Sequence, residues 1–72
     1  MERSAVTSSN LASVGYDAET QTLEVEFGKG GVYRYFDVPA AVYLSLMAAS
    51  SLGTYFDLHV KKAGYRHQKV SS

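Results

Sequence analysis

The chain has 72 residues, seven basic and seven acidic side chains, two histidines and no cysteine. This length allows one small domain, and the lack of cysteine excludes disulfide bonds and thiolate metal sites, so we expect no metal and no cofactor. The zero net charge argues against a protein that grips a long duplex, because such proteins are basic overall. With no leader-like segment and no long apolar run, the sequence predicts a cytoplasmic protein that does not contact a membrane.

The charges are distributed unevenly along the chain. Residues 1–57 carry three basic side chains against all seven acidic ones, a net charge of −4. Residues 58–72 carry four basic side chains and no acidic one, a net charge of +4. This basic end is either a solvated tail or a candidate surface for anions.

The first half of the chain predicts an antiparallel meander of three strands. Residues 1–7 are polar and are expected to be flexible, and residues 10–16 form the first strand. The sequence Thr22-Leu23-Glu24-Val25-Glu26-Phe27 alternates apolar and acidic residues, which is typical of a half-buried strand. The glycine-rich residues 28–31 form the next turn, and residues 32–37 form the third strand.

The length of this turn decides which side chains share a face. A two- or four-residue loop places Leu23, Val25 and Phe27 on the face of Arg34. A three-residue loop places them with Tyr33 and Tyr35 instead. We favour the second register, because it buries tyrosine rings and leaves Arg34 free for solvent or a ligand. A bulge would reconcile the two.

The second half predicts two helices, which makes the fold class α+β. Pro39 suits the first position of a helix over residues 40–49, with Asp37 as a candidate cap. A shorter helix spans residues 54–60, with Ser51 or Thr54 as its N-cap, and Gly64 ends it. Residues 65–70 are a candidate final edge strand. The predicted domain covers residues 8–70, residues 71–72 are a tail, and the predicted core holds Leu23, Val25, Phe27, Val38, Val42 and Leu46.

Residues 38–56 contain no formal charge. Pro39 together with Ser50, Ser51 and Gly53 excludes a membrane span in this stretch. A helix that is apolar or small on every side is usually buried on more than one side, and one small sheet covers only one of them. We therefore expect a homo-oligomer that packs through this helix; a half-exposed helix is the alternative.

The sequence contains no recognisable catalytic motif, and we predict that the protein is not an enzyme. Asp57 and His59 are two apart, so on a helix they point to different sides. The remaining chemistry is that of binding: arginine and lysine for phosphates, tyrosine for stacking on bases, and serine at a helix start for an anion. The candidate ligand-binding residues are Tyr33, Arg34, Tyr35, Ser51, Tyr55, Lys61, Tyr65 and Arg66. Each tyrosine has core packing as its alternative role.

Residues 8–70 resemble the KTSC domain, a family of small domains that occurs alone in bacteria and phages and at the C-terminal end of some lysyl-tRNA synthetases. The resemblance is carried by Ser9-Asn10-Leu11, Val14-x-Tyr16-Asp17, Leu23-x-Val25-x-Phe27, Tyr33-x-Tyr35-x-x-Val38-Pro39, Val42-Tyr43, Ser51-x-Gly53-x-Tyr55-Phe56-Asp57, Val60-Lys61 and Tyr65. Two positions depart from the family pattern: Lys61, where arginine is more usual, and Asp57, where asparagine is common.

The resemblance implies a non-enzymatic binding domain for nucleotide-type ligands, since RNA binding is suspected for the family. One alternative is a free-standing oligomer that sequesters a small cyclic nucleotide signal in a pocket between protomers. A second alternative is a protein-interaction module that uses the uncharged helix. RNA binding predicts a steep dependence on salt, sequestration predicts stabilisation by one small ligand, and the interaction module predicts neither.

Overall fold

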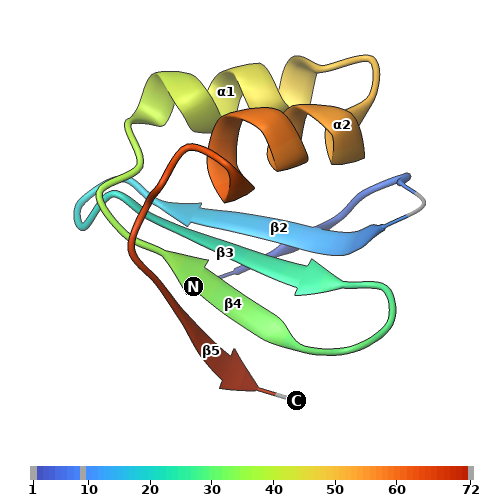
Figure 1. The fold of residues 1–72 in the computed structure, drawn as a ribbon, viewed down its shortest axis with the longest axis horizontal. Helices are drawn as coiled ribbons and strands as arrows, with labels where there is room; N and C mark the ends of the chain where they lie inside the picture. The colour runs from blue at the N-terminus through green and yellow to red at the C-terminus, as the bar shows by residue number, and fades with distance from the viewer. Residues whose placement is uncertain (1, 9, 72) are drawn as a thin grey trace.

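The protein is a five-stranded antiparallel sheet with its helices on one face (Figure 1). The structure is a computed structural model that describes residues 2–8 and 10–71. Three residues lie outside these ranges: Met1 of the segment expected to be flexible, Ser9 of the family pattern and Ser72 of the predicted tail. The strands follow one another in sheet order: β1 (Ser4–Ala5), β2 (Leu11–Asp17), β3 (Thr22–Phe27), β4 (Val32–Tyr35) and β5 (His67–Ser71). The α+β class, the three central strands and the candidate edge strand are confirmed.

The predicted number of strands was too small, because β1 was missed. Ser4 and Ala5 pair with Val14 and Ser13 and extend the sheet beyond β2. The close approach depends on Gly15, since a Cβ there would lie 2.3 Å from the Glu2 carbonyl oxygen. No real Cβ tolerates that distance, so glycine is needed at this position.

The domain boundaries expected at residues 8 and 70 stay a prediction.

The hairpin between β3 and β4 has the favoured register. Leu23 pairs with Tyr35 and Val25 with Tyr33, while Glu24 pairs with Arg34. The Phe27 N–H donates to the Gly31 carbonyl at 3.0 Å, which leaves three residues in the loop. Gly30, the last residue of that loop, has a φ of 107°, a conformation that glycine adopts at little cost.

Two helices and a π-helical turn cover one face of the sheet. They are α1 (Ala40–Ala48), α2 (Leu52–Phe56) and η1 (Asp57–Lys61), which continues α2 directly. Pro39 takes the N-cap position of α1, and Asp37 does not cap it but adopts a positive φ of 58° instead. Ser51 is the N-cap residue of α2, yet its hydroxyl bonds Thr54 Oγ1 and no backbone N–H. None of these helices is long and apolar enough to cross a membrane.

The core lies between the helices and the sheet. Leu23, Val25, Val38 and Leu46 are completely buried, as predicted, whereas Phe27 and Val42 only pack against the edge of the core. Further buried residues come from β2, β4, α2 and η1: Leu11, Val14, Tyr35, Phe56 and Val60. No helix formed by the described residues covers the opposite face of the sheet (Figure 1). We call it the open face.

Candidate nucleotide-binding pocket

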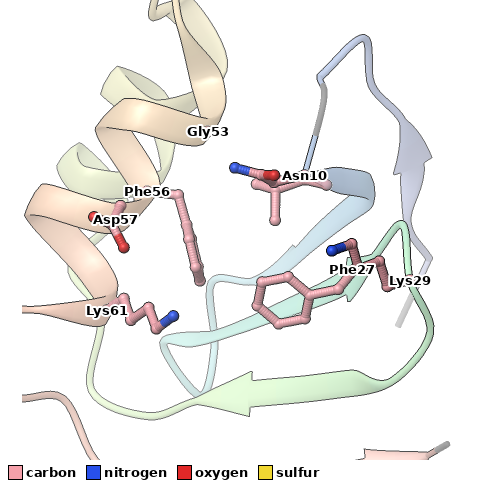
Figure 2. Close-up of a pocket in the computed structure, with 8 residues that line it drawn as sticks. Asn10, Phe27, Lys29, Gly53, Phe56, Asp57 and Lys61 are labelled. Atoms are coloured by element: carbon pink, nitrogen blue, oxygen red, sulfur yellow. The ribbon is translucent and has the colours of Figure 1, made fainter.

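A pocket of about 300 Å³ opens at one end of the sheet, beneath α2 (Figure 2). Four segments far apart in the sequence contribute to it: the start of β2, the end of β3, the β3–β4 hairpin and the α2–η1 helix. We call it the α2 pocket. Its walls are formed by Asn10, Leu11, Phe27, Lys29, Gly53, Phe56, Asp57 and Lys61.

Two phenylalanines form the apolar part of the α2 pocket. The rings of Phe27 and Phe56 are 5.6 Å apart and meet edge to face at 72°. Phe56 is part of the core and is only 3% exposed, so it fixes the floor of the pocket. Phe27 is half-buried, and its other side packs edge-on against Tyr33 at 5.4 Å. Phe27 therefore supplies most of the aromatic surface that a planar ligand can contact, and Phe56 supports it from the core.

The polar groups of the pocket come from both sides of this aromatic surface. Lys29 lies in the hairpin and Lys61 at the end of η1, and the Lys61 ammonium extends toward the two rings in Figure 2. Across the described ranges, 2–8 and 10–71, no carboxylate lies within 4 Å of either lysine nitrogen, whereas Lys62 pairs with Asp57 at 3.3 Å. Two uncompensated cations thus border one small pocket.

Local hydrogen bonds hold the pocket in shape. The Gly28 N–H donates to the Asn10 carbonyl at 2.8 Å and so ties the hairpin to the start of β2. The Ser8 hydroxyl accepts from the Asn10 and Leu11 N–H groups at 3.3 and 3.4 Å. Gly53 lies close by, because a Cβ there would be 3.2 Å from Ser8 Oγ and 3.5 Å from Asn10 Nδ2. The glycine lets α2 approach this segment closely.

The π-helical turn supplies the pocket's two charged residues from the α2–η1 helix. The Lys62 N–H donates to the Asp57 carbonyl at 3.0 Å, a bond that spans one residue more than in an α-helix. Turns of this kind are rare and are found frequently at functional sites. Here the turn begins at Asp57 and ends at Lys61, and both side chains border the pocket.

A second, more open groove of about 460 Å³ lies at the other end of the sheet. It is formed by Asp17, Thr20, Thr22, Arg34, Phe36, Asp37 and Arg66. We call it the open-face groove. The Arg66 guanidinium lies over the Phe36 ring at 4.9 Å. Two aspartates lie beside the two arginines, so this groove is electrostatically mixed and less suited to a phosphate than the α2 pocket.

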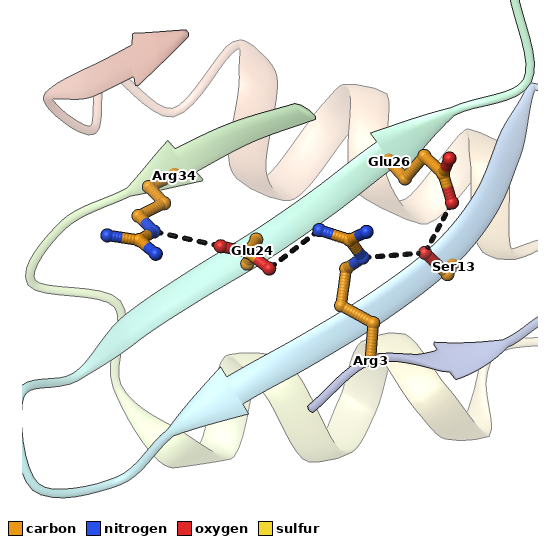
Figure 3. A network of polar contacts seen from close by, with 5 residues as sticks. All are labelled: Arg3, Ser13, Glu24, Glu26 and Arg34. Carbon is orange, nitrogen blue, oxygen red and sulfur yellow. Dashed lines mark hydrogen bonds and ion pairs between the residues drawn. The ribbon is translucent and has the colours of Figure 1, made fainter. Parts of the chain in front are cut away.

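Arg34 is held by Glu24 in a network on the open face (Figure 3). Its Nε lies 2.8 Å from Glu24 Oε1, and Arg3 Nη1 lies 2.7 Å from Glu24 Oε2. Burial alone would raise the pKa of Glu24, but the hydrogen bonds from Arg34 and Arg3 outweigh it and lower that pKa. Arg34 therefore already has an anionic partner within the protein.

Comparison with known proteins places the chain in a family. Residues 7–65 match the model of the KTSC domain. This protein belongs to the KTSC domain family. The crystal structure of a KTSC domain protein from Yersinia pestis superimposes with a TM-score of 0.89 at 36% identity and covers 96% of both chains.

Relatives of this KTSC domain occur alone and within larger proteins. An uncharacterised protein of Stutzerimonas stutzeri is 47% identical over 70 residues, which span 97% of this chain and 99% of that protein. The lysine–tRNA ligase of Trichormus variabilis is 41% identical over 56 residues, which span 78% of this chain and 10% of the ligase. The match thus concerns a small part of the ligase and carries none of its activity to this domain.

Family pattern and pocket coincide in this KTSC domain. Seven of the residues quoted for the resemblance line the α2 pocket although more than forty positions separate the first from the last: Asn10, Leu11, Phe27, Gly53, Phe56, Asp57 and Lys61. Asp57 and Lys61 are the two positions that depart from the family pattern. The central tyrosine pair lies elsewhere. Tyr35 is 5% exposed and Tyr33 half-buried, so both contribute to packing around the core.

The predicted binding residues do not form one site. Lys61 lines the α2 pocket, whereas Arg34 and Arg66 line the open-face groove. Tyr65 packs against the core, Tyr55 lies 4.3 Å from the His59 ring, and the exposed Ser51 bonds Thr54. Six residues of the α2 pocket were not among the predicted binding residues: Asn10, Phe27, Lys29, Gly53, Phe56 and Asp57. The available signal was the resemblance itself, which contains all of these except Lys29.

Proposed function

We propose that this KTSC domain is a non-enzymatic binding module that holds one nucleotide unit of RNA in the α2 pocket. The observation that carries the proposal is the pairing of uncompensated cations with an aromatic surface: Lys29 and Lys61 border the rings of Phe27 and Phe56. Ammonium groups bind phosphate oxygens, and aromatic surfaces bind the faces and edges of bases.

Each remaining polar group of the pocket has a matching group on a nucleotide. The Asn10 amide can both donate to and accept from a base edge. The Asp57 carboxylate only accepts, which suits a ribose hydroxyl and repels phosphate. Since the 2′-hydroxyl distinguishes RNA from DNA, Asp57 would favour RNA.

Size and charge support a short ligand. A volume of about 300 Å³ is at the lower end of the range for small-molecule sites and suits a single nucleotide. The net charge of the chain is zero, so long-range attraction of a duplex is weak. With two lysines contacting phosphates, the logarithm of the binding constant for single-stranded RNA should fall with the logarithm of salt concentration with a slope of about −1 to −2.

The test is a titration of the protein with nucleoside monophosphates, the corresponding nucleosides, a cyclic dinucleotide and a single-stranded RNA. Lys29→Ala and Lys61→Ala should each weaken monophosphate binding by about 1.5–3 kcal/mol, the contribution of a charge-assisted hydrogen bond. Arg66→Ala is the matched control, because this cation lies in the open-face groove. Equal weakening by all three variants would contradict a site in the α2 pocket.

The same titration distinguishes RNA binding from sequestration of a cyclic nucleotide. An RNA module binds the RNA at least as tightly as the monophosphate, and Asp57→Asn reduces its preference over the matching DNA strand. Tight binding of the cyclic dinucleotide alone, at a fixed small stoichiometry, would support sequestration of a cyclic signal instead. Binding of neither would exclude both readings.

A second candidate function is association through α1, favoured by the exposure of its outer side. Leu44 is 63% exposed in a stretch without any formal charge. A second copy of the chain offers the same uncharged surface, so pairing would desolvate no ion. The homo-oligomer expected from the sequence would form through this helix.

A further inference from the structure

The last strand extends the surface of the α2 pocket with an exposed ring. In the pairing of β4 with β5, His67 stands opposite Tyr35 and Lys69 opposite Tyr33. These side chains are therefore on the helix-facing side of the sheet. Both His67 and Lys69 are nevertheless exposed, because β5 is the edge strand and lies outside the area that the helices cover (Figure 1).

The His67 ring is the outer member of an aromatic stack that begins in the core. Phe56 meets Tyr35 edge to face at 5.5 Å, and Tyr35 stacks on His67 at 5.3 Å with an angle of 29° between the rings. Tyr35 is 5% exposed, so the stack is fixed from within. His67 Nδ1 lies 3.4 Å from the Tyr65 carbonyl oxygen, which also orients the ring. His67 is exposed at the sheet edge, where a base can stack on the outward side of its ring.

Pocket and stack are connected by aromatic contacts. Phe27, which lines the α2 pocket, packs on Tyr33 at 5.4 Å, and Tyr33 lies 6.4 Å from His67. Two ring-to-ring contacts therefore connect the pocket to the exposed imidazole of His67.

The charges along this route favour a phosphate backbone. Lys61 lies at the pocket and Lys69 on β5, and no acidic residue follows Asp57 in the sequence. Among the residues that the structure describes, no carboxylate pairs with Lys69. Arg66, by contrast, lies over Phe36 in the open-face groove and does not belong to this route.

We propose that His67 is a second base-binding position for single-stranded RNA: the nucleotide next to the one in the α2 pocket stacks on the imidazole, and Lys69 contacts the phosphate between them. The proposal rests on the proposed function of the pocket. It extends the recognised ligand from a mononucleotide to a short strand, with an aromatic stacking position at the edge of the sheet.

The test compares a nucleoside monophosphate with a trinucleotide in the full chain. His67→Ala should weaken trinucleotide binding about fivefold to a hundredfold, the effect of losing one base stack, and should leave monophosphate binding unchanged. His67→Phe keeps a flat ring and should restore most of the affinity. Gln68→Ala is the matched control, because Gln68 pairs with Arg34 on the open face of the same strand.

The outcomes separate this inference from the proposed function. If the monophosphate does not bind, the pocket proposal fails and the stacking position fails with it. If the monophosphate binds but His67→Ala binds the trinucleotide as the wild type does, only the stacking position is refuted. If His67→Ala weakens binding and His67→Phe does not restore it, the imidazole acts by charge or hydrogen bonding, and stacking is refuted as well.

Discussion

The buried carboxylate of Glu24 provides the sharpest test of what stabilises the sheet. Its side chain is only 7% exposed, although it lies on the face opposite the described helices, because Arg3 and Arg34 close over it. Glu24→Gln keeps the shape but removes the charge that both guanidinium groups contact. Each charge-assisted hydrogen bond contributes about 1.5–3 kcal/mol, while the two arginines, 29% and 45% exposed, regain water in the variant. We therefore expect a net loss of about 2–3 kcal/mol at neutral pH.

The pKa of Glu24 adds a dependence on pH. In the folded protein this pKa is below its ordinary value of 4.5, since the hydrogen bonds from the arginines outweigh the effect of burial. The group thus binds protons more readily in the unfolded state. Its contribution to stability is fully present above the unfolded pKa and is lost as pH falls through the lowered folded pKa. Urea denaturation should show wild type losing stability below about pH 4.5 more steeply than Glu24→Gln does.

Glu26 provides the control, because it lies two residues further along β3 on the same face. Its carboxylate accepts one hydrogen bond, from the neutral Ser13 hydroxyl at 2.8 Å. Glu26→Gln should therefore cost no more than about 0.5–1.5 kcal/mol at neutral pH. Equal losses in the two variants, or the same acid dependence in Glu24→Gln as in wild type, would refute the assignment of stability to the Arg3–Glu24–Arg34 network.

Two further predictions concern α1. Leu46 is completely buried, so Leu46→Ala should lower the free energy of unfolding by about 2–4 kcal/mol in urea denaturation, whereas Leu58→Ala, at a position 54% exposed, should change it by less than about 0.5 kcal/mol. Light scattering at micromolar concentration should give a mass well above the 7.9 kDa of one chain, and Leu44→Lys should reduce it to that value. A monomeric wild type would refute association through α1.

The meander was predictable from local sequence patterns, and its register was predictable from the cost of burying a charged side chain. The alternation of residues 22–27 defines β3, and the glycine loop defines the hairpin. The register then followed from a comparison of two outcomes: burying Arg34 in an apolar core, or burying the two tyrosine rings. The first is far more costly. The structure has the second, with Arg34 opposite Glu24 on the open face.

The strand β1 was not predictable by such rules. Ser4 and Ala5 have little strand propensity and form only two pairs. What holds them is distant in sequence: the absence of a side chain at Gly15 and the ion pair from Arg3 to Glu24. Hydrophobic periodicity indicates which face of the sheet a side chain lies on, but it does not indicate a contact with a residue ten or twenty positions away.

The α2 pocket was missed for a related reason. Its lysines are thirty-two positions apart, Lys29 in a turn and Lys61 at the end of a helix, and each alone looks like a solvated surface residue. Phe27 was assigned to the core from its strand pattern, and in fact it lies where core and pocket meet. A site assembled from four segments has no spacing that a sequence motif could report. Its residues could be picked out only as members of the family pattern.

The structure also changes how the basic residues of the C-terminal segment 58–72 are interpreted, because it places them on different sides of the sheet. From the sequence, residues 58–72 formed one block with a net charge of +4. In the fold, Lys61 and Lys69 lie on the helix-facing side, Lys62 pairs with Asp57, and Arg66 lies in the open-face groove. A single ligand on the helix-facing side therefore meets only part of this charge. If the domain binds a short RNA strand as proposed, the aromatic surface supplies much of the affinity, and removal of the exposed His67 ring tests the proposed stacking position more directly than removal of one more cation.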